Sequence, residues 1–299
     1  QDTMLAAPLI NEHRRSYSLN ALGKTYCGDE KDETLLKEAA SAWNVDPKAE
    51  MYLLPAHYVG EYAEQDAVLT LKLWDKLSKE VEKEGLQGIY DLESSLLPLL
   101  IEMRWRGVRV DTVKAEELSK TLQVREKDCV KEIKRKWGVD VDIWASASIA
   151  KVFDKAGITY PRTEKTGAPS FKAQWLEQLD HELPQLMVKA RKHNKIHSTF
   201  IDGMVLEHSH KGRLHGQMHP LRGDAGGTVS GRFSYSTPNL QQVPARDPEL
   251  GPLVRGLFLP EEGHAWGAFD YSQQEPRLTV HYASMLNLEG AKQAVNEYN

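Results

Sequence analysis

The clearest repeating pattern in the chain is a run of apolar residues at helical spacing between residues 59 and 84. Residues on one face recur three or four positions apart, whereas charged residues fall largely on the other faces. This arrangement predicts one long amphipathic helix, and Gly85 ends it because glycine readily adopts the conformation that closes helices. The predicted buried face carries Tyr62, Asp66, Leu69, Leu73 and Leu77.

Weaker helical patterns lie on both sides of this helix. Ser18–Gly23 predicts a short helix that Gly23 ends, and another helix begins near Asp32. After residue 90 a second apolar stripe predicts a helix that contains a proline, where we expect a kink, and that ends at Gly107. This stripe consists of Leu92, Leu96, Leu99, Leu100 and Met103, with Pro98 as the proline.

The middle of the chain is also predicted to be helical. Val108–Val110 is a short extended segment, and Asp111 then caps a helix over 112–137. Its apolar seam is narrow in a strongly charged sequence, so we expect it to pack along one side only. Ser146 caps a shorter helix that stops at Gly157, a loop of turn residues follows, and further helices continue to about residue 208.

The last third of the chain changes in character. Arg213–Pro220 alternates enough to predict one strand, and a glycine-rich connection follows it. Trp266–Phe269 is a run of small and aromatic residues that leads directly to an acid, which predicts a short buried strand ending at Asp270. A helix with Pro276 in its first turn comes next. Mostly helical segments followed by a small antiparallel sheet predict an α/β chain of the α+β type.

Composition narrows the class of protein. The 299 residues include 40% hydrophobic and 27% charged residues, the balance of an ordinary soluble protein with room for about two domains. No apolar run approaches the length of a membrane span and no signal peptide is visible, so we expect a cytoplasmic protein. Cys27 and Cys129 are far apart, which predicts neither a disulfide framework nor a zinc site. The first residue is glutamine, which suggests a fragment.

Charge is distributed unevenly. The net charge of −5 argues against indiscriminate nucleic-acid binding, but residues 189–222 carry seven Lys or Arg against two acids, together with six of the eleven histidines. Such a stretch can contact phosphates while the rest of the protein repels DNA, or it can be a solvated charged face. His208 and His210 are a weak candidate metal pair, since no partner motif accompanies them.

Two acids stand out as candidates for chemistry. Asp66 lies on the predicted buried face, where an unpaired carboxylate is costly, so a metal or a hydrogen-bond partner must compensate it. Asp270 at a strand end suits Mg²⁺, a hard cation that binds one or two carboxylates and substrate phosphates. Ordinary alternatives remain for both. Asp66 and Tyr62 also fit a plain helix, and Ser272 with Glu275 also fits a capping box.

Two longer segments resemble the palm of DNA polymerase I enzymes, the family A DNA polymerases. Gly226-Gly-Thr-Val-Ser-Gly-Arg232-Phe-Ser-Tyr-Ser-Thr-Pro-Asn239-Leu-Gln241-Gln242-Val-Pro-Ala-Arg246 is similar to the first palm segment of that family. Asp270-Tyr-Ser-Gln-Gln-Glu275-Pro-Arg277 is similar to its D-Y-S-Q-x-E-x-R segment. The form with Gln274 and Pro276 resembles phage-type members. Order and spacing over two blocks make this signal far more specific than a single glycine motif.

The resemblance implies template-directed DNA synthesis by two Mg²⁺ ions, with primer-template DNA and deoxynucleoside triphosphates as partners. Asp270 and the Tyr271 carbonyl would bind metal, and Tyr271, Ser272, Gln273 and Glu275 would line the nucleotide site. Glu275 would exclude the ribose 2′-hydroxyl, and Arg277 would brace the site from behind. DNA contacts would come from Lys195, Ser198 and Thr199 in the thumb and from Arg232, Asn239, Gln241, Gln242 and Arg246 in the palm.

Tyr62-Ala-Glu-Gln-Asp66 resembles the Y-x-x-x-D motif of proofreading 3′-5′ exonucleases, where the tyrosine orients water and the aspartate binds metal. The resemblance therefore divides the chain into 1–85 from an exonuclease domain, 86–212 as connecting helix and thumb, and 213–299 as the first part of the palm. The other exonuclease acids, the fingers and the second palm acid are not recognisable. We therefore expect a monomeric, inactive fragment of a DNA polymerase, located in the host cytoplasm if phage-encoded. A 3′-5′ exonuclease and a non-catalytic DNA-binding module are the alternatives.

Overall fold

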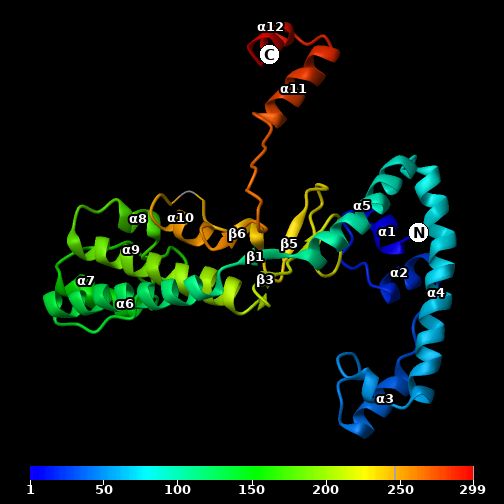
Figure 1. The fold of residues 1–299 in the computed structure, drawn as a ribbon, viewed down its shortest axis with the longest axis horizontal. Helices are drawn as coiled ribbons and strands as arrows, with labels where there is room; N and C mark the ends of the chain where they lie inside the picture. Colours follow the sequence, from blue (N-terminus) through cyan, green and yellow to red (C-terminus); the bar gives the residue numbers. More distant parts are fainter. Residues whose placement is uncertain (246, 299) are drawn as a thin grey trace. The chain divides into compact units, whose positions relative to one another are not determined.

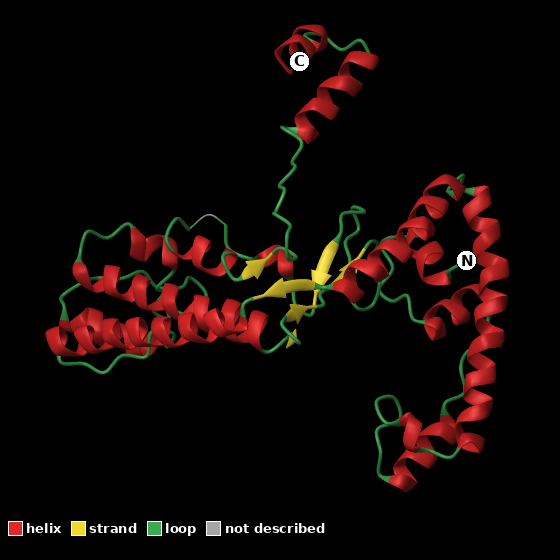
Figure 2. Ribbon diagram, in the orientation of Figure 1, coloured by secondary structure: helices red, strands yellow, loops and turns green. Residues whose placement is uncertain are grey.

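The computed structural model describes residues 1–245 and 247–298, and divides into two compact units, Gln1–Leu259 and Pro260–Asn299. Helices dominate both units, and the strands gather in a small part of the first (Figure 2). The strands that pair are antiparallel. This confirms the predicted α+β class with predominantly helical structure. Among the described residues, no helix combines the length and apolarity needed to cross a membrane.

Helix α4 organises the N-terminal part of the first unit (Figure 1). It covers Ala56–Lys83 and is followed by Gly85 at φ +68°, close to the predicted ends. Leu69, Leu73 and Leu77 are buried, which confirms the apolar face predicted from spacing. The other elements of this part are α1 (Thr3–Ile10), α2 (Leu19–Cys27), α3 (Thr34–Trp43), the 3₁₀ helix η1 (Met51–Leu53) and α5 (Gln87–Arg106).

Helix α2 corrects one predicted boundary. Ser18 accepts a hydrogen bond from the backbone N–H of Ala21 at its start, but the helix continues past Gly23 and ends at Gly28. A Cβ atom at Gly23 would lie 2.8 Å from a methyl group of Leu69 on α4. The glycine therefore permits close packing of two helices, which local sequence does not distinguish from a helix end.

Helix α5 corrects the predicted stripe in part. Leu100 is buried as predicted, but Leu92, Leu99 and Met103 are about half exposed. The buried residues of α5 are instead Tyr90, Glu93 and Leu100. Spacing identifies which residues share a face, but the packing partners decide which face is covered. The helix ends before Gly107, as predicted.

The middle of the first unit is a helical bundle that matches the predictions closely. Helix α6 covers Thr112–Trp137, its start capped by Asp111, and it packs against α9 and the π-helix η2. Helix α7 starts at Ser146, but Ala145 occupies the capping position, and Asp142 accepts hydrogen bonds from the N–H groups of Trp144 and Ala145. The predicted Ser146 cap is therefore wrong. The bundle contains α7 (Ser146–Lys155), α8 (Ala173–Glu177), α9 (Glu182–Lys195) and η2 (Ile196–Leu206).

A four-stranded sheet joins segments that are far apart in the chain. Its order is β2-β3-β1-β6, and Val108 of β1 pairs with Leu214 of β3. The single strand predicted over Arg213–Pro220 is wrong, because the segment splits between this sheet and a separate hairpin of β4 and β5. The strands are β1 (Val108–Val110), β2 (Ser209–His210), β3 (Arg213–Leu214), β4 (Gln217–His219), β5 (Ser234–Ser236) and β6 (Phe258–Leu259).

The segment before Asp270 does not form the predicted buried strand. Phe269 is 98% exposed and Trp266 is 62% exposed, and no described strand pairs with this segment. Strand geometry requires a neighbouring strand for its backbone hydrogen bonds, and the second unit supplies none among its described residues. The remaining elements are the 3₁₀ helix η3 (Leu240–Gln242), α10 (Leu250–Arg255), α11 (Gln274–Met285) and α12 (Ala291–Tyr298).

Candidate functional site

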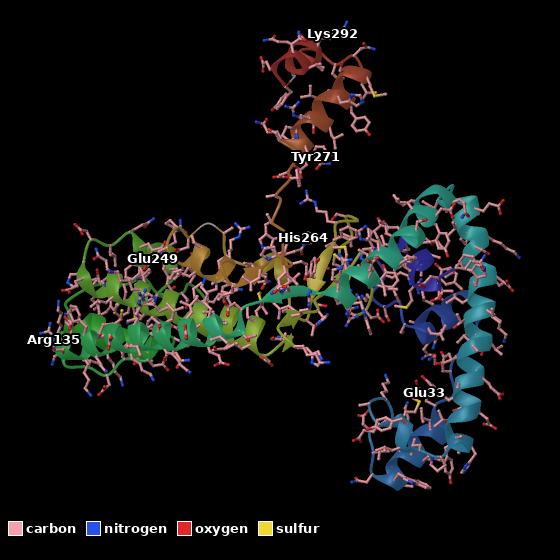
Figure 3. All side chains as sticks on the ribbon, in the orientation of Figure 1. Glu33, Arg135, Glu249, His264, Tyr271 and Lys292 are labelled. Atoms are coloured by element: carbon pink, nitrogen blue, oxygen red, sulfur yellow. The ribbon has the colours of Figure 1, made fainter. Side chains whose placement is uncertain are left out.

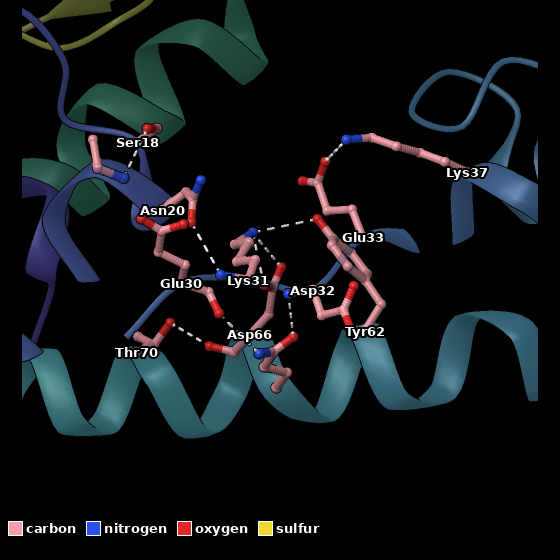
Figure 4. A network of polar contacts seen from close by, with 12 residues as sticks. Ser18, Asn20, Glu30, Lys31, Asp32, Glu33, Lys37, Tyr62, Asp66 and Thr70 are labelled. Carbon is pink, nitrogen blue, oxygen red and sulfur yellow. Dashed lines mark hydrogen bonds and ion pairs between the residues drawn. The ribbon is translucent and has the colours of Figure 1, made fainter. Parts of the chain in front are cut away.

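Asp66 and Tyr62 lie together on one face of α4, as their spacing predicted, and a lysine completes the group (Figure 4). The ammonium of Lys31 lies 2.7 Å from Oδ1 of Asp66 and 2.8 Å from Oδ2. It also donates to the phenol oxygen of Tyr62 at 3.3 Å. The half-buried carboxylate therefore has the compensating partner that its position requires, and that partner is a lysine.

The backbone around Lys31 is held from two helices. Asn20 on α2 accepts a hydrogen bond from the N–H of Lys31 at 3.0 Å. Gln65 on α4 accepts from the N–H of Asp32 at 2.9 Å and donates to the carbonyl of Glu30 at 3.1 Å. The lysine is thus presented to Asp66 by an anchored segment. Lys31 gives no signal in the sequence, because it stands in a polar run of acids without periodicity.

Electrostatics favour the charged form of this lysine. Burial alone would lower the pKa of Lys31, but hydrogen bonds with Asp66 and Tyr62 and the charge of Asp66 outweigh it, so the pKa of Lys31 is raised. The ammonium side chain is only 12% exposed. A charged lysine against both carboxylate oxygens does not fit a metal at Asp66, and no cluster of three or more metal-binding side chains occurs among residues 1–245 and 247–298.

The Asp270 segment presents its side chains to solvent. Asp270, Tyr271, Ser272, Gln273, Glu275 and Arg277 are all exposed. Gln273 adopts a left-handed conformation and occupies the N-cap position of α11 without a side-chain capping hydrogen bond. Ser272 is therefore not the N-cap residue that the alternative capping box requires. Figure 3 labels Tyr271 where its side chain extends from the segment that leads into α11.

Arg277 secures the turn that follows Asp270. Its Nε donates to the carbonyl of Ser272 at 2.9 Å, and its backbone N–H donates to Gln273 at 3.0 Å. The arginine therefore holds the polar turn against the first turn of α11. Asp270 itself is a single carboxylate, and no group of three or more metal-binding side chains occurs among the described residues.

The predicted palm contacts lie around the hairpin of β4 and β5. Thr228 donates to the carbonyl of Arg232 at 2.8 Å, and Gly227 donates its N–H to Ser234 at 3.0 Å, so the Arg232 loop is folded back on the hairpin. Asn239 caps η3, and Gln241 donates to the carbonyl of Phe233 at 3.0 Å. Gln242 is exposed, and Arg246 lies outside the described residues.

The predicted thumb contacts lie where α9 continues into η2. Lys195, Ser198 and Thr199 are exposed, and Ile196, His197 and Phe200 between and after them are buried. The hydroxyl of Ser198 donates to the carbonyl of Asn194 at 2.8 Å. Because a hydroxyl has one proton to donate, Ser198 contacts a phosphate as a donor only after this bond breaks. Lys195 and Thr199 are the better placed candidates.

A contact across 207 residues joins the start of α2 to the palm-like loop. Asp224 accepts from the backbone N–H of Tyr17 at 2.6 Å and from the hydroxyl of Ser16 at 2.9 Å. The same region lines a cavity of about 620 Å³ that also involves α1 and β4. The contact of Asp224 with Ser16 and Tyr17 leaves no signal in the sequence, because it arises from tertiary packing.

Family models match most of the chain. Residues 112–296 match DNA polymerase family A, and residues 1–82 match a 3′-5′ exonuclease. Curated relatives and a solved structure also match, and the chain covers only part of the length of each.

Among curated relatives, a DNA-directed DNA polymerase of Pseudomonas phage M6 is 38% identical over 295 residues, which is 95% of this chain and 44% of the relative. DNA polymerase DpoZ of Acinetobacter phage SH-Ab 15497 is 34% identical over 306 residues, 94% of this chain and 49% of the relative. The thermostable DNA polymerase I of Thermus filiformis is 34% identical over 262 residues, which is 82% of this chain and 31% of the relative. The chain spans about half the length of the phage relatives that it matches.

One solved structure supports the fold. It is the POL domain of Pol1 from M. smegmatis, in complex with DNA primer-template and dNTP. The TM-score is 0.70 at 24% sequence identity, and the match covers 95% of this chain and 45% of that chain.

Proposed function

Because the chain belongs to DNA polymerase family A, we propose that it supplies the exonuclease-like, thumb and first palm parts of a template-directed DNA polymerase. The proposal assigns 1–85 to the exonuclease-like domain, 86–212 to the connecting helix and thumb, and 213–299 to the palm. Its chief support is the family match over 112–296, which contains both palm-like segments. The relative in complex with primer-template and dNTP supports DNA and deoxynucleotides as partners.

Family A DNA polymerases are metal-dependent enzymes. We propose Mg²⁺ as the metal and two ions in the complete polymerase site, with Asp270 and the Tyr271 carbonyl among the ligands. A single exposed carboxylate does not hold two such ions, so the proposed site needs a second acid in addition to Asp270. Within the chain, Arg277 orients the turn that carries Ser272 and Gln273 by its hydrogen bond to Ser272.

The palm and thumb residues would bind DNA without reading its sequence. Lys195 and Thr199 would contact phosphate oxygens, with Ser198 joining after its internal bond breaks. Arg232 would reach the minor-groove side of the primer end, where the acceptors are largely common to all base pairs. Further contacts along template and primer would come from Asn239, Gln241, Gln242 and Arg246. We place the protein in the cytoplasm, which is the host cytoplasm if the protein is phage-encoded, and propose that it is a monomer.

We predict that the 299-residue chain binds primer-template DNA but does not extend the primer. Binding is followed by fluorescence anisotropy between 50 and about 200 mM salt, a range over which phosphate contacts weaken strongly. Lys195→Ala should weaken binding and reduce the salt slope by about 1, and Lys165→Ala on an exposed loop should change neither. Incorporation of a labelled deoxynucleotide by this chain would contradict the proposal that synthesis needs a second acid besides Asp270. Absence of binding would contradict the DNA-binding assignment.

A 3′-5′ exonuclease is the second candidate function, favoured by the family match over 1–82. Trimming of a labelled single strand without any extension by the complete protein would favour it over the polymerase. A module that binds DNA without catalysis would show neither reaction. The lysine on Asp66 argues against trimming by the chain alone.

We also predict a role for Glu275 in sugar selection. In the complete polymerase, Glu275→Ala should lower discrimination against ribonucleotides by about tenfold or more, because a shorter side chain leaves room for the 2′-hydroxyl. Gln274→Ala, one residue away on α11, is the matched control. Competition between a deoxynucleotide and its ribonucleotide during single-nucleotide extension measures the effect. Unchanged discrimination in the Glu275 variant would remove this role.

A further inference from the structure

A chain of hydrogen bonds crosses the thumb-like bundle at the helix junction before η2. Glu126 on α6 is its centre, since Oε2 lies 2.6 Å from Nε2 of His197 and Oε1 accepts from Nδ2 of Asn194 at 3.1 Å. The Oδ1 of Asn194 in turn accepts from the indole N–H of Trp144 at 3.1 Å. One carboxylate thus connects α6, the end of α9, η2 and the loop before α7.

The network is anchored at its outer end. The guanidinium of Arg191 lies 5.3 Å from the ring centre of Trp144 and donates to the carbonyls of Ile143 and Phe171, each at 2.7 Å. Burial lowers the pKa of Arg191. These bonds fix the loop that carries Trp144, so the indole is a rigid donor for Asn194.

His197 lies on the inner side of η2 and is only 8% exposed. Because a carboxylate only accepts hydrogen bonds, Nε2 of His197 carries the proton in its bond to Glu126. Nδ1 lies 3.5 Å from Oδ2 of Asp202, five residues later. Removal of the Glu126 carboxylate would leave a buried imidazole N–H without an acceptor, which is costly.

The hydrogen bond between His197 and Glu126 also bears on the backbone conformation of η2. Eleven residues form a π-helix, a conformation that usually extends over a single turn and often occurs at functional sites. The N–H of Glu207 bonds to the carbonyl of Asp202, five residues earlier. In such a helix, the inward direction of His197 determines which residues face outward, and these include Thr199.

We propose that Glu126 and His197 are positioning residues that fix the π-helical register of η2 and so direct Lys195 and Thr199 toward the DNA backbone. The inference rests on the proposed DNA-binding function for its second half. Its first half, the register of η2, concerns the chain alone. Neither residue is placed in contact with DNA.

The test measures amide hydrogen exchange in residues 196–206 without DNA, and primer-template binding separately. Glu126→Ala and His197→Ala should each speed exchange in that segment by about tenfold or more, the effect of losing a charge-assisted buried hydrogen bond. The exchange rate of Glu126→Gln should lie between those of the two alanine variants and that of the parent, because the amide oxygen of glutamine keeps one acceptor. Glu117→Gln, at an exposed position on the same helix, is the matched control.

The binding measurement then tests the direction of the phosphate contacts. Glu126→Ala should weaken binding and lower the salt slope by about 1, although it removes a negative charge that would otherwise repel DNA. The rate of amide exchange in α4 serves as an internal reference. A variant in which exchange is also faster in α4 has lost its fold. In that case the exchange rates of Glu126→Gln test the register role. Unchanged exchange in 196–206 would overturn the register role. Faster exchange with unchanged binding would overturn the positioning role, whereas a parent chain that fails to bind DNA refutes the proposed function and leaves the exchange result valid.

Discussion

Gly227→Ala is expected to disrupt the loop that carries Arg232, with a loss of about 2–4 kcal/mol in local stability. A Cβ atom at this position would lie 2.1 Å from the carbonyl oxygen of Leu221 and 2.6 Å from Cα of Arg222. These are backbone atoms, so no side-chain rotation relieves the clash. The residue also has φ +97°, a conformation that side chains rarely adopt.

Gly223→Ala in the same loop is the matched control, because a Cβ atom there meets nothing within 4 Å. Limited proteolysis of the 221–236 segment compares the two variants directly, and primer-template binding shows the functional effect. Rapid cleavage and weaker binding are expected for Gly227→Ala, with Gly223→Ala close to the parent. If both variants resist cleavage equally, the close approach at Leu221 does not constrain the loop.

Lys31→Met is expected to destabilise the N-terminal helices by about 1–3 kcal/mol, since it leaves the half-buried carboxylate of Asp66 uncompensated. This expected loss of stability lies below the usual range for buried ion pairs, because the Asp66 side chain is 29% exposed. Chemical denaturation followed by tryptophan fluorescence, to which Trp74 beside Tyr90 contributes in this part, reports the loss. Lys37→Met removes an ion pair with Glu33 in which the lysine is 63% exposed, against 12% for Lys31, and it should cost less.

The same ion pair predicts a pH dependence. The pKa of Lys31 in the folded chain is raised above its usual 10.5, so the pair contributes fully below that value. Its contribution is lost as pH rises through the folded pKa, when the ammonium loses its proton. From neutral pH upward, the difference in stability between the parent and Lys31→Met should therefore shrink only in strongly alkaline solution. A difference that shrinks near neutral pH would exclude this pair as its source.

The long helices could be predicted from sequence because each carries its own signals. In α6, the cap at Asp111, an apolar seam and the final glycine all act within one segment. Helical spacing likewise placed Tyr62 and Asp66 on one face, since residues four apart on a helix are neighbours. Gly23 shows the limit, because one residue type serves both to end helices and to let helices approach.

The partners of the site residues could not be predicted in the same way. Lys31 meets Asp66 across 35 residues, and Glu126 meets His197 across 71. Neither pair leaves a periodic trace in the sequence. The buried strand predicted before Asp270 failed for a related reason, since apolar residues favour burial only where a neighbouring element covers them.

The antiparallel pairing of Val108 with Leu214 means that the intervening helices leave the sheet and return to it at the same point. This arrangement is that of an inserted domain, whose two ends meet and can be bridged by a tight turn. Changes in the length or tilt of the inserted arm therefore need not alter the strands at its base.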